Sequence, residues 1–293
     1  MKKLIKIILT VILFAAACCY EYILPLDVSE AAVPVRGQLE IKMLDVGHGD
    51  AVLLRTRAST ILVDTGDYKH DEQLVARLKK LGIKRLDALI LTHHHLDHIG
   101  GSLKILQNFQ VEQLYDNGFA NPQSEISKEL TSRYRSGKLS RKILKDGQKV
   151  TLTEGLSLQV LAPLPQNSFS EKDLNNNSLV FKLQYGDFSM LFTGDIEAKA
   201  EHDLVKRYGK GLHSTVLKVA HHGSGTSSTY NFLTSVQPQL ALISCGEQEK
   251  YNHPNKKILG TFSYLQIPVK VTSWQGEITL TTIGKGFEIS TEK

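Results

Sequence analysis

Six consecutive residues, His93-His94-His95-Leu96-Asp97-His98, constrain this chain more than any other segment. They offer several side chains that bind metals, and imidazole together with carboxylate suits Zn, Mn or Fe better than Mg or Ca. An apolar run at residues 86–92 precedes them and Gly100-Gly101 follows, which predicts a loop at the end of a β-strand. Such a loop can bring His93, His95, Asp97 and His98 to one point, whereas a helix would place His93 and His98 on different faces. The alternative, a surface histidine tract, leaves the carboxylate and the glycine pair unexplained.

The first 19 residues have the pattern of a bacterial export signal. Lys2, Lys3 and Lys6 lie before and within an apolar stretch at residues 4–17, and Cys18-Cys19 follows. The segment could be removed by signal peptidase, lipidated on Cys18, or kept as a membrane anchor. In these three cases, the rest of the chain is exported, either secreted or held at the extracellular face of the cell membrane. A buried N-terminal helix is the remaining alternative.

Residues 20–37 are predicted to be a linker, and residues 38–293 one domain of alternating strands and helices. Strand-like segments occur at residues 39–46, 51–54 and 61–64, and residues 71–81 have the apolar spacing of a helix. Residues 111–115 are expected to form one strand and residues 124–134 a helix. A second half begins near Lys149, contains a hairpin turn at Gly186-Asp187 and ends in a group of strands at residues 269–289. Two similar halves predict an α/β fold with four layers, an αββα sandwich whose helices lie outside.

Two further strand ends carry residues that bind metals. Asp195 follows the apolar run at residues 188–193, and His221-His222 follow the run at residues 215–220. Each motif alone is also common in ordinary turns. Together with the histidine run, however, they supply donors for more than one ion, because a dinuclear site gathers about seven or eight ligand atoms from distant segments.

The combination resembles the metallo-β-lactamase superfamily of hydrolases. The resemblance rests on the His93-x-His95-x-Asp97-His98 run, on Asp64, on Asp195 and on the His221-His222 pair, which occur in corresponding positions at strand ends. Four stretches are more narrowly similar to the metallo-hydrolase domain of the ComEC/Rec2 DNA-uptake proteins: residues 44–51, 175–180, 192–195 and 221–224. No apolar run of about 20 residues follows residue 19, so the channel of those proteins is not expected here.

This resemblance implies hydrolysis by a metal-bound hydroxide, with one or two divalent ions, Zn or Mn, as cofactor. One well-held ion is expected at Asp97, His98, Asp195 and one of His221 or His222. His222 is favoured because superfamily members often place the ligand directly before glycine. A weaker ion is expected at His93 and His95, with Asp195 bridging the two.

Supporting roles are implied by the same resemblance. Asp64 is expected to fix the imidazole of a ligand histidine. His48 replaces a glutamine of the family motif, either as a ligand or as a hydrogen-bond partner. Asn177 or Ser178 stands where other members carry a further ligand histidine. Asp97 is expected to orient the attacking water, and His253 or Ser224 to contact the transition state or the leaving group; for His253 the alternative is an ordinary loop histidine.

Three functions remain open at this point. They are a phosphodiesterase or nuclease acting on DNA, a hydrolase of a small ester such as a choline-phosphate ester or a lactone, and a non-enzymatic lipoprotein that binds DNA. The last is disfavoured because four ligands would saturate a structural zinc site and the sequence offers more. No protein partner is inferred.

Charge gives only local support for a DNA substrate. Three units of the net charge of +5 come from the N-terminal lysines, so the overall charge says little about a polyanionic partner. A basic segment between residues 128 and 149 is more informative, although a solvated helix and loop is the alternative. The residues predicted to contact nucleic acid are Arg133, Arg135, Lys138, Arg141 and Lys142.

Overall fold

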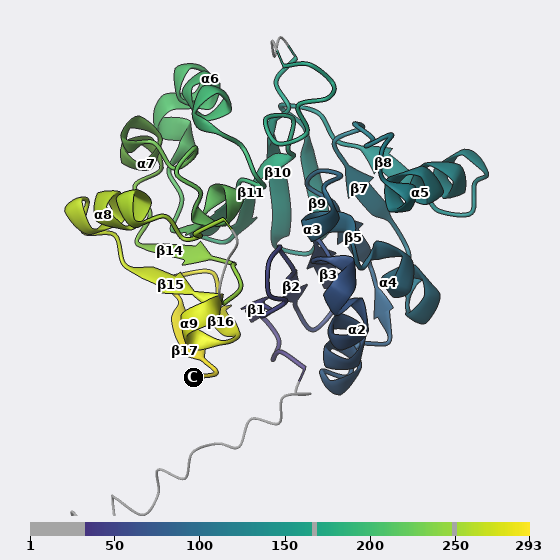
Figure 1. The fold of residues 1–293 in the computed structure, drawn as a ribbon. Helices are drawn as coiled ribbons and strands as arrows, with labels where there is room; N and C mark the ends of the chain where they lie inside the picture. The colour runs from purple at the N-terminus through teal and green to yellow at the C-terminus, as the bar shows by residue number, and fades with distance from the viewer. Residues whose placement is uncertain (1–32, 166–168, 248–250) are drawn as a thin grey trace, which may run out of the picture. The chain divides into compact units, whose positions relative to one another are not determined.

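Two β-sheets pack face to face in the part of the chain that the computed structural model describes, which is residues 33–165, 169–247 and 251–293 (Figure 1). The first sheet has eight strands in the order β17-β16-β1-β2-β3-β5-β7-β8. These strands are β1 (Leu39–Met43), β2 (Val52–Arg55), β3 (Thr60–Val63), β5 (Ala88–Ile90), β7 (Leu114–Asp116), β8 (Arg141–Ile143), β16 (Ile278–Thr282) and β17 (Glu288–Thr291).

The second sheet has seven strands in the order β15-β14-β13-β12-β11-β10-β9. These are β9 (Lys149–Thr153), β10 (Leu156–Ala162), β11 (Val180–Tyr185), β12 (Phe188–Phe192), β13 (Val216–Lys218), β14 (Leu240–Ile243) and β15 (Val269–Val271). A small third sheet pairs β4 (Arg85–Leu86) with β6 (Gln110–Val111).

Alternation of side chains along the central strands creates the layers. Leu54 and Ile61 point between the two sheets, where they join Phe181 and Met190 of the second sheet in one buried cluster. Their neighbour Leu53 belongs instead to the cluster on the outer face of the first sheet. Burying each such side chain stabilises the folded state by about 1.5–3 kcal/mol. The apolar side chains on both faces of each sheet therefore favour the layered arrangement.

Helices cover the two outer faces (Figure 1). The apolar sides of α2 (Asp71–Lys80), α4 (Ser102–Asn108) and α5 (Glu125–Arg135) pack on the first sheet. Those of α6 (Ala198–Tyr208), α7 (Tyr230–Val236) and α8 (Lys256–Tyr264) pack on the second. The predicted four-layer αββα sandwich is thereby confirmed.

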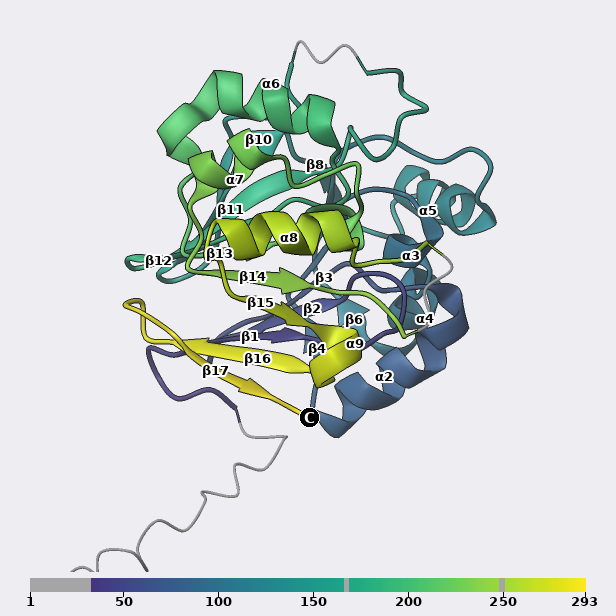
Figure 2. The same cartoon turned by 60° about the vertical axis from the view of Figure 1, so that its left-hand side comes forward.

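The structure differs from the predicted elements in three places. The last strands do not extend the second half: β16 pairs with β1, Met43 opposite Ile278, and β17 pairs with β16, while the short helix α9 (Thr272–Gln275) connects them to β15 (Figure 2). Both β1 and β16 alternate buried and half-buried residues, so their apolar faces match. Residues 111–115 were expected to form one strand but are divided between β6 and β7. The basic segment at residues 128–149, for which a helix and loop were considered, also contains β8 and the start of β9.

The predicted helix at residues 71–81 and the hairpin at Gly186-Asp187 are confirmed as α2 and as the turn between β11 and β12. The predicted export segment and most of the predicted linker lie outside the described residues. Among the described helices, none combines the length and hydropathy that crossing a bilayer requires.

Candidate metal centre

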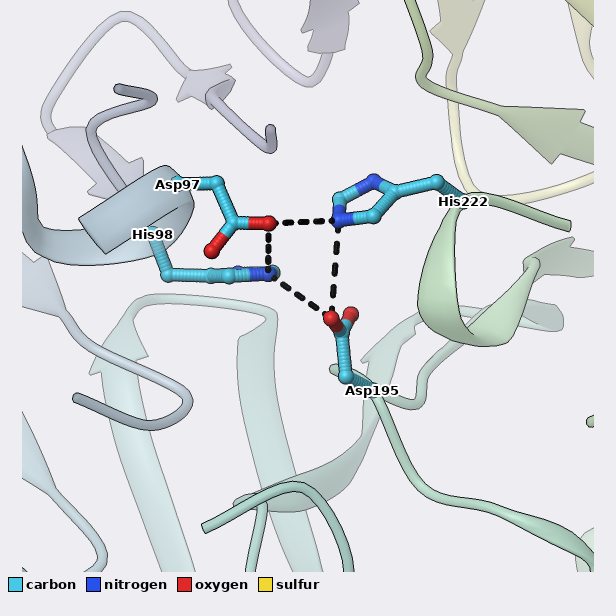
Figure 3. Close-up of side chains that lie close together, drawn as sticks. All are labelled: Asp97, His98, Asp195 and His222. Atoms are coloured by element: carbon cyan, nitrogen blue, oxygen red, sulfur yellow. Dashed lines mark ion pairs between the residues drawn. The ribbon is translucent and has the colours of Figure 1, made fainter. Parts of the chain in front are cut away.

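Four donor atoms from three distant segments of the chain meet near the carboxyl ends of β12 and β13 (Figure 3). Asp97 and His98 lie on the one-turn helix α3 (Leu96–Ile99), while Asp195 follows β12 and His222 follows β13. His98 Nε2 is 3.2 Å from Asp195 Oδ2, which is 3.5 Å from His222 Nε2; that nitrogen is in turn 3.3 Å from Asp97 Oδ2. Two ligands that each lie about 2.0–2.2 Å from one tetrahedral ion are roughly 3.3–3.6 Å apart. The spacing therefore fits a single ion.

The orientation of His98 is fixed from behind by Asp64. His98 Nδ1 donates to Asp64 Oδ2 at 2.8 Å, and the same carboxylate accepts the Thr92 N–H at 2.8 Å and the Thr92 hydroxyl at 2.7 Å. Because Nδ1 carries the proton, the lone pair of Nε2 faces the donor cluster. Carboxylates that hold ligand histidines in this way are typical of metal sites.

His222 is directed inward by an unusual backbone. His221 and His222 have φ values of 51° and 54°, in the left-handed region, which costs a non-glycine residue on the order of 1–3 kcal/mol. His222 Nδ1 donates to the carbonyl of Ser244 at 2.9 Å, which again leaves Nε2 to face the cluster. His221 points elsewhere and is 3.5 Å from Glu197 Oε1. Of the two adjacent histidines, only His222 joins the group of four.

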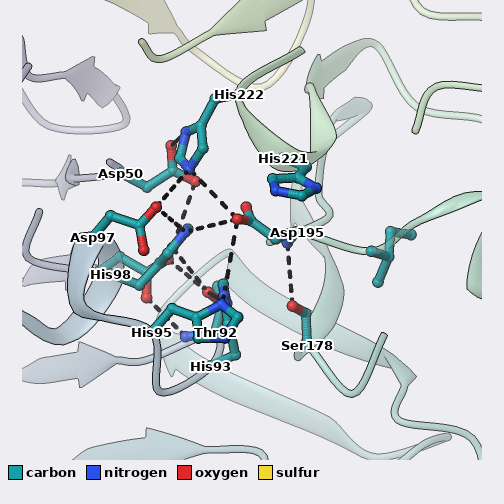
Figure 4. A network of polar contacts seen from close by, with 12 residues as sticks. Asp50, Thr92, His93, His95, Asp97, His98, Ser178, Asp195, His221 and His222 are labelled. Carbon is teal, nitrogen blue, oxygen red and sulfur yellow. Dashed lines mark hydrogen bonds and ion pairs between the residues drawn. The ribbon is translucent and has the colours of Figure 1, made fainter. Parts of the chain in front are cut away.

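A second, looser donor group adjoins the first (Figure 4). His93 Nε2 lies 3.1 Å from His95 Nδ1 and 3.9 Å from Asp195 Oδ2. Thr92 Oγ1 lies 3.2 Å from His93 Nδ1, and since this hydroxyl already donates to Asp64, it accepts from the imidazole. The Nε2 lone pair of His93 thus faces His95, and the carboxylate of Asp195 stands between the two groups.

The charges of the cluster residues favour the binding of a cation. Burial alone would lower the pKa of His98 and of His222, but Asp195 and neighbouring carboxylates raise both pKa values well above the usual 6.5. Burial would likewise raise the pKa of Asp195, yet the two imidazoles hold it well below 3.8. A divalent cation would satisfy these carboxylates without protonating the imidazoles.

Three buried atoms of the cluster also have no hydrogen-bond partner within the described part of the chain: His98 Nε2, Asp195 Oδ1 and His222 Nε2. Buried polar atoms are rarely left in this state. Neutral imidazole nitrogens and carboxylate oxygens that converge without hydrogen bonds are what a Zn or Mn ion needs. The residues therefore fit the cofactor that the sequence predicts, although they do not distinguish between these metals.

Sequence reasoning assigned no role to Asp50 or Lys218. Both are buried, and Lys218 Nζ lies 2.5 Å from Asp50 Oδ2. Asp50 Oδ1 is also 3.5 Å from His222 Nδ1. Burial would raise the pKa of Asp50, but the charges of Lys218 and His222 lower it to about 2. The sequence did contain a signal for these two residues, because Asp50 lies within the family-like stretch 44–51 and Lys218 lies shortly before the stretch 221–224. Only the fold shows that the two side chains contact each other.

Three other expected site residues lie around the cluster at different distances. His48 Nε2 is 3.2 Å from Asp97 Oδ2, so it contacts a member of the donor group. The ring of His253 lies 6.3 Å from that of His222, and burial together with nearby imidazoles lowers its pKa to about 4. Ser224 is buried, and its hydroxyl lies 3.0 Å from that of Thr226.

Asn177 and Ser178 form hydrogen bonds that shape the backbone. The amide of Asn177 donates to the carbonyls of Ser170 and Asp173, both at 2.9 Å. The hydroxyl of Ser178 accepts the backbone N–H of Asp195 at 3.1 Å (Figure 4). The Ser178 hydrogen bond positions the backbone of Asp195, whereas those of Asn177 hold the loop that precedes it. That one of the two side chains takes the position of a ligand histidine stays a prediction.

The predicted nucleic-acid contacts divide into two groups. Arg133 pairs with Glu129 on the same helix, and Arg141 lies 2.8 Å from the buried carboxylate of Asp116. Arg141 also stacks on the ring of Tyr134, with 4.5 Å between guanidinium and ring centre. The other three predicted contacts are exposed and lie near α5 and β8: Arg135, Lys138 and Lys142.

Comparison with known proteins places this architecture in a family. Residues 44–247 match the model of the metallo-beta-lactamase superfamily. The chain belongs to that superfamily, and the match together with the donor cluster makes it a metal-dependent hydrolase. The solved structure of CmlA, a diiron β-hydroxylase from Streptomyces venezuelae, shares the fold with a TM-score of 0.54 at 15% identity, over 83% of this chain and 54% of that one.

Competence proteins are among its relatives in sequence. The chain is 32% identical over 259 residues to ComE operon protein 3 of Bacillus subtilis, which covers 82% of this chain and 32% of that protein. It is 32% identical over 229 residues to competence protein ComA of Neisseria gonorrhoeae, covering 78% of this chain and 30% of that protein. The chain thus spans about a third of the length of these curated relatives.

Proposed function

We propose that this protein hydrolyses phosphodiester bonds in DNA with divalent metal held at the donor cluster. The observation that carries the proposal is the convergence of Asp97, His98, Asp195 and His222, whose spacing fits one ion. His93 and His95, with Asp195 shared, would hold a second, weaker ion. Similarity to competence proteins supports DNA as the substrate.

When bound, such a cation lowers the pKa of water from 15.7 to about 7 and so supplies a nucleophile at neutral pH. The protein's own residues orient the reactants. Asp97 Oδ2 faces both His48 and His222 within the donor group, which leaves the second carboxylate oxygen, Oδ1, to accept a hydrogen bond from the attacking water. His253 is half-buried and neutral at pH 7, and it can donate a hydrogen bond to a non-bridging oxygen of the substrate.

The place of action is also part of the proposal. The N-terminal segment, with lysines before an apolar stretch and a cysteine pair, supports export, followed by release or by attachment to the membrane.

The direct test measures hydrolysis of single-stranded DNA and of bis(p-nitrophenyl) phosphate after adding Zn or Mn to metal-free protein. We expect turnover that depends on added metal and falls at least about a hundredfold in Asp195→Ala, because that carboxylate serves both donor groups. Tyr264→Ala is the matched control, since Tyr264 is exposed on α8 and does not contact the cluster. Absence of turnover with either substrate and either metal would refute the proposal.

Thermal unfolding separates loss of chemistry from loss of fold. Zn should raise the melting temperature of the native protein by binding the folded state, and this increase should be absent in Asp195→Ala. If both proteins respond to Zn equally, the ion binds elsewhere and the proposed site is wrong.

A further inference from the structure

A cavity of about 620 Å³ opens beside His95. This volume lies within the range of roughly 300–1,000 Å³ that is common for ligand pockets. One wall is the loop between β7 and α5, residues 117–123, and the opposite wall includes Glu171, Lys172 and Leu174. Because His95 belongs to the second donor group, a molecule in this cavity would lie next to the metal centre.

Both walls are fixed relative to the donor groups. The Asn121 amide donates to the carbonyl of His94 at 3.3 Å, and the Asn117 amide donates to the carbonyl of Asn177 at 2.8 Å. The segment that provides the opposite wall continues into Ser178, whose hydroxyl accepts the N–H of Asp195. These hydrogen bonds attach the 117–123 loop and the segment that leads to Ser178 to the donor groups.

The chemistry of the lining suits a flat, polar-edged aromatic molecule. Phe119 is half-buried in the cavity wall and belongs to none of the three hydrophobic clusters found among the described residues. Gln123 presents an amide, which can donate and accept along the edge of a base. Lys172 is exposed at the rim and offers an ammonium group to a phosphate. Aromatic stacking with such polar contacts is how proteins hold unpaired bases.

We propose that this cavity holds one unstacked nucleobase of a single-stranded DNA substrate, with the adjoining phosphodiester at the donor cluster. The inference rests on the proposed function and adds a strand preference to it. In a duplex each base is stacked and paired, so it would have to be flipped out before entering. Single strands and frayed ends are consequently the preferred substrates.

Binding tests the cavity without cleavage. We would measure fluorescence anisotropy of a fluorescein-labelled (dT)12 strand, and of its duplex with (dA)12, with metal-free protein. Phe119→Ala should weaken single-strand binding about tenfold, as expected for loss of one base–aromatic stack, while Phe119→Trp should retain it. The melting temperatures of both variants show whether they fold. Equal affinity of native protein and Phe119→Ala for (dT)12, or equal binding of duplex and single strand, would overturn the inference.

Kinetics distinguish failure of this inference from failure of the proposed function. We compare kcat/KM for the p-nitrophenyl ester of thymidine 5′-monophosphate with kcat/KM for bis(p-nitrophenyl) phosphate. The ratio should fall about tenfold in Phe119→Ala and remain at the native value in Tyr264→Ala. If the native protein hydrolyses both esters but the ratio is the same in Phe119→Ala, the base site is refuted and the phosphodiesterase remains. If neither ester is hydrolysed, the phosphodiesterase itself fails, and the anisotropy measurement still decides whether a base binds here.

Discussion

Lys218 Nζ lies 2.5 Å from Asp50 Oδ2, and both side chains are almost completely buried beside the donor cluster. Lys218 also donates to the carbonyl of Val219 at 2.9 Å. Asp50 in turn is 3.5 Å from His222 Nδ1 and 3.9 Å from His98 Nδ1. The pair thus connects β13 to His98 and His222 on the Nδ1 side of each ring, which faces away from the proposed ion.

Removing the lysine should destabilise the protein strongly. In Lys218→Met the carboxylate of Asp50 remains buried without its main counter-charge, which costs about 3–5 kcal/mol in comparable buried pairs. Urea unfolding of the metal-free proteins measures this loss. The double variant Lys218→Met/Asp50→Asn lacks both charges and should recover most of the stability. A double variant no more stable than Lys218→Met would show that the buried charge is not the cause.

The two adjacent histidines should differ in their effect on metal affinity. His222→Ala removes a nitrogen that faces Asp97 and Asp195, and we expect Zn affinity to fall at least about a hundredfold, more than loss of a supporting contact typically costs. His221→Ala removes a side chain that contacts Glu197 and should change affinity by less than about threefold. Competition with a chromophoric chelator gives both values. The reverse order would assign the ligand to His221.

Contacts between the exposed cations and phosphates should appear in the salt dependence of DNA binding. Each phosphate contact on a single strand contributes about 0.7 to the slope of log K against log salt. Replacing Arg135, Lys138 and Lys142 with alanine should therefore reduce the slope by about 2. Arg207→Ala is the control, because Arg207 lies on α6 and pairs with Asp146 in the turn between β8 and β9. An unchanged slope in the triple variant would remove this surface from the DNA site.

Glu201 on α6 provides a pH-dependent test of the fold. It is buried and accepts the backbone N–H groups of Ser228 and Thr229, and burial raises its pKa above 4.5. A carboxyl whose pKa is higher in the folded state stabilises the fold below its unfolded pKa and loses this contribution as pH rises. As the pH rises from 4.5 to 7.5, the native protein should therefore lose stability relative to the Glu201→Gln variant. Urea unfolding at the two pH values measures the difference, and a constant difference would contradict the raised pKa.

Local sequence alone determined most of the elements and the chemical types of the donors. Helix spacing predicted α2, the glycine turn predicted the hairpin of β11 and β12, and the runs ending in His or Asp identified the strands that carry the donors. These patterns are local, because the period of apolar residues and the conformational freedom of glycine act over a few residues. They could not place β16 beside β1, since strand pairing between residues far apart in the chain depends on the matching of whole faces.

Only the tertiary structure decided that His222, and not His221, meets the other donors. Neighbours in sequence, His221 and His222, point in different directions because both adopt left-handed backbone conformations, and no residue pattern at this position predicts that. Arg141, predicted to contact nucleic acid, lies against Asp116, and Lys218 lies against Asp50. In each case the side chain has a partner distant in sequence. Arg141 reaches Asp116 because β8 pairs with β7 in one sheet, and Lys218 reaches Asp50 because the second sheet packs against the first.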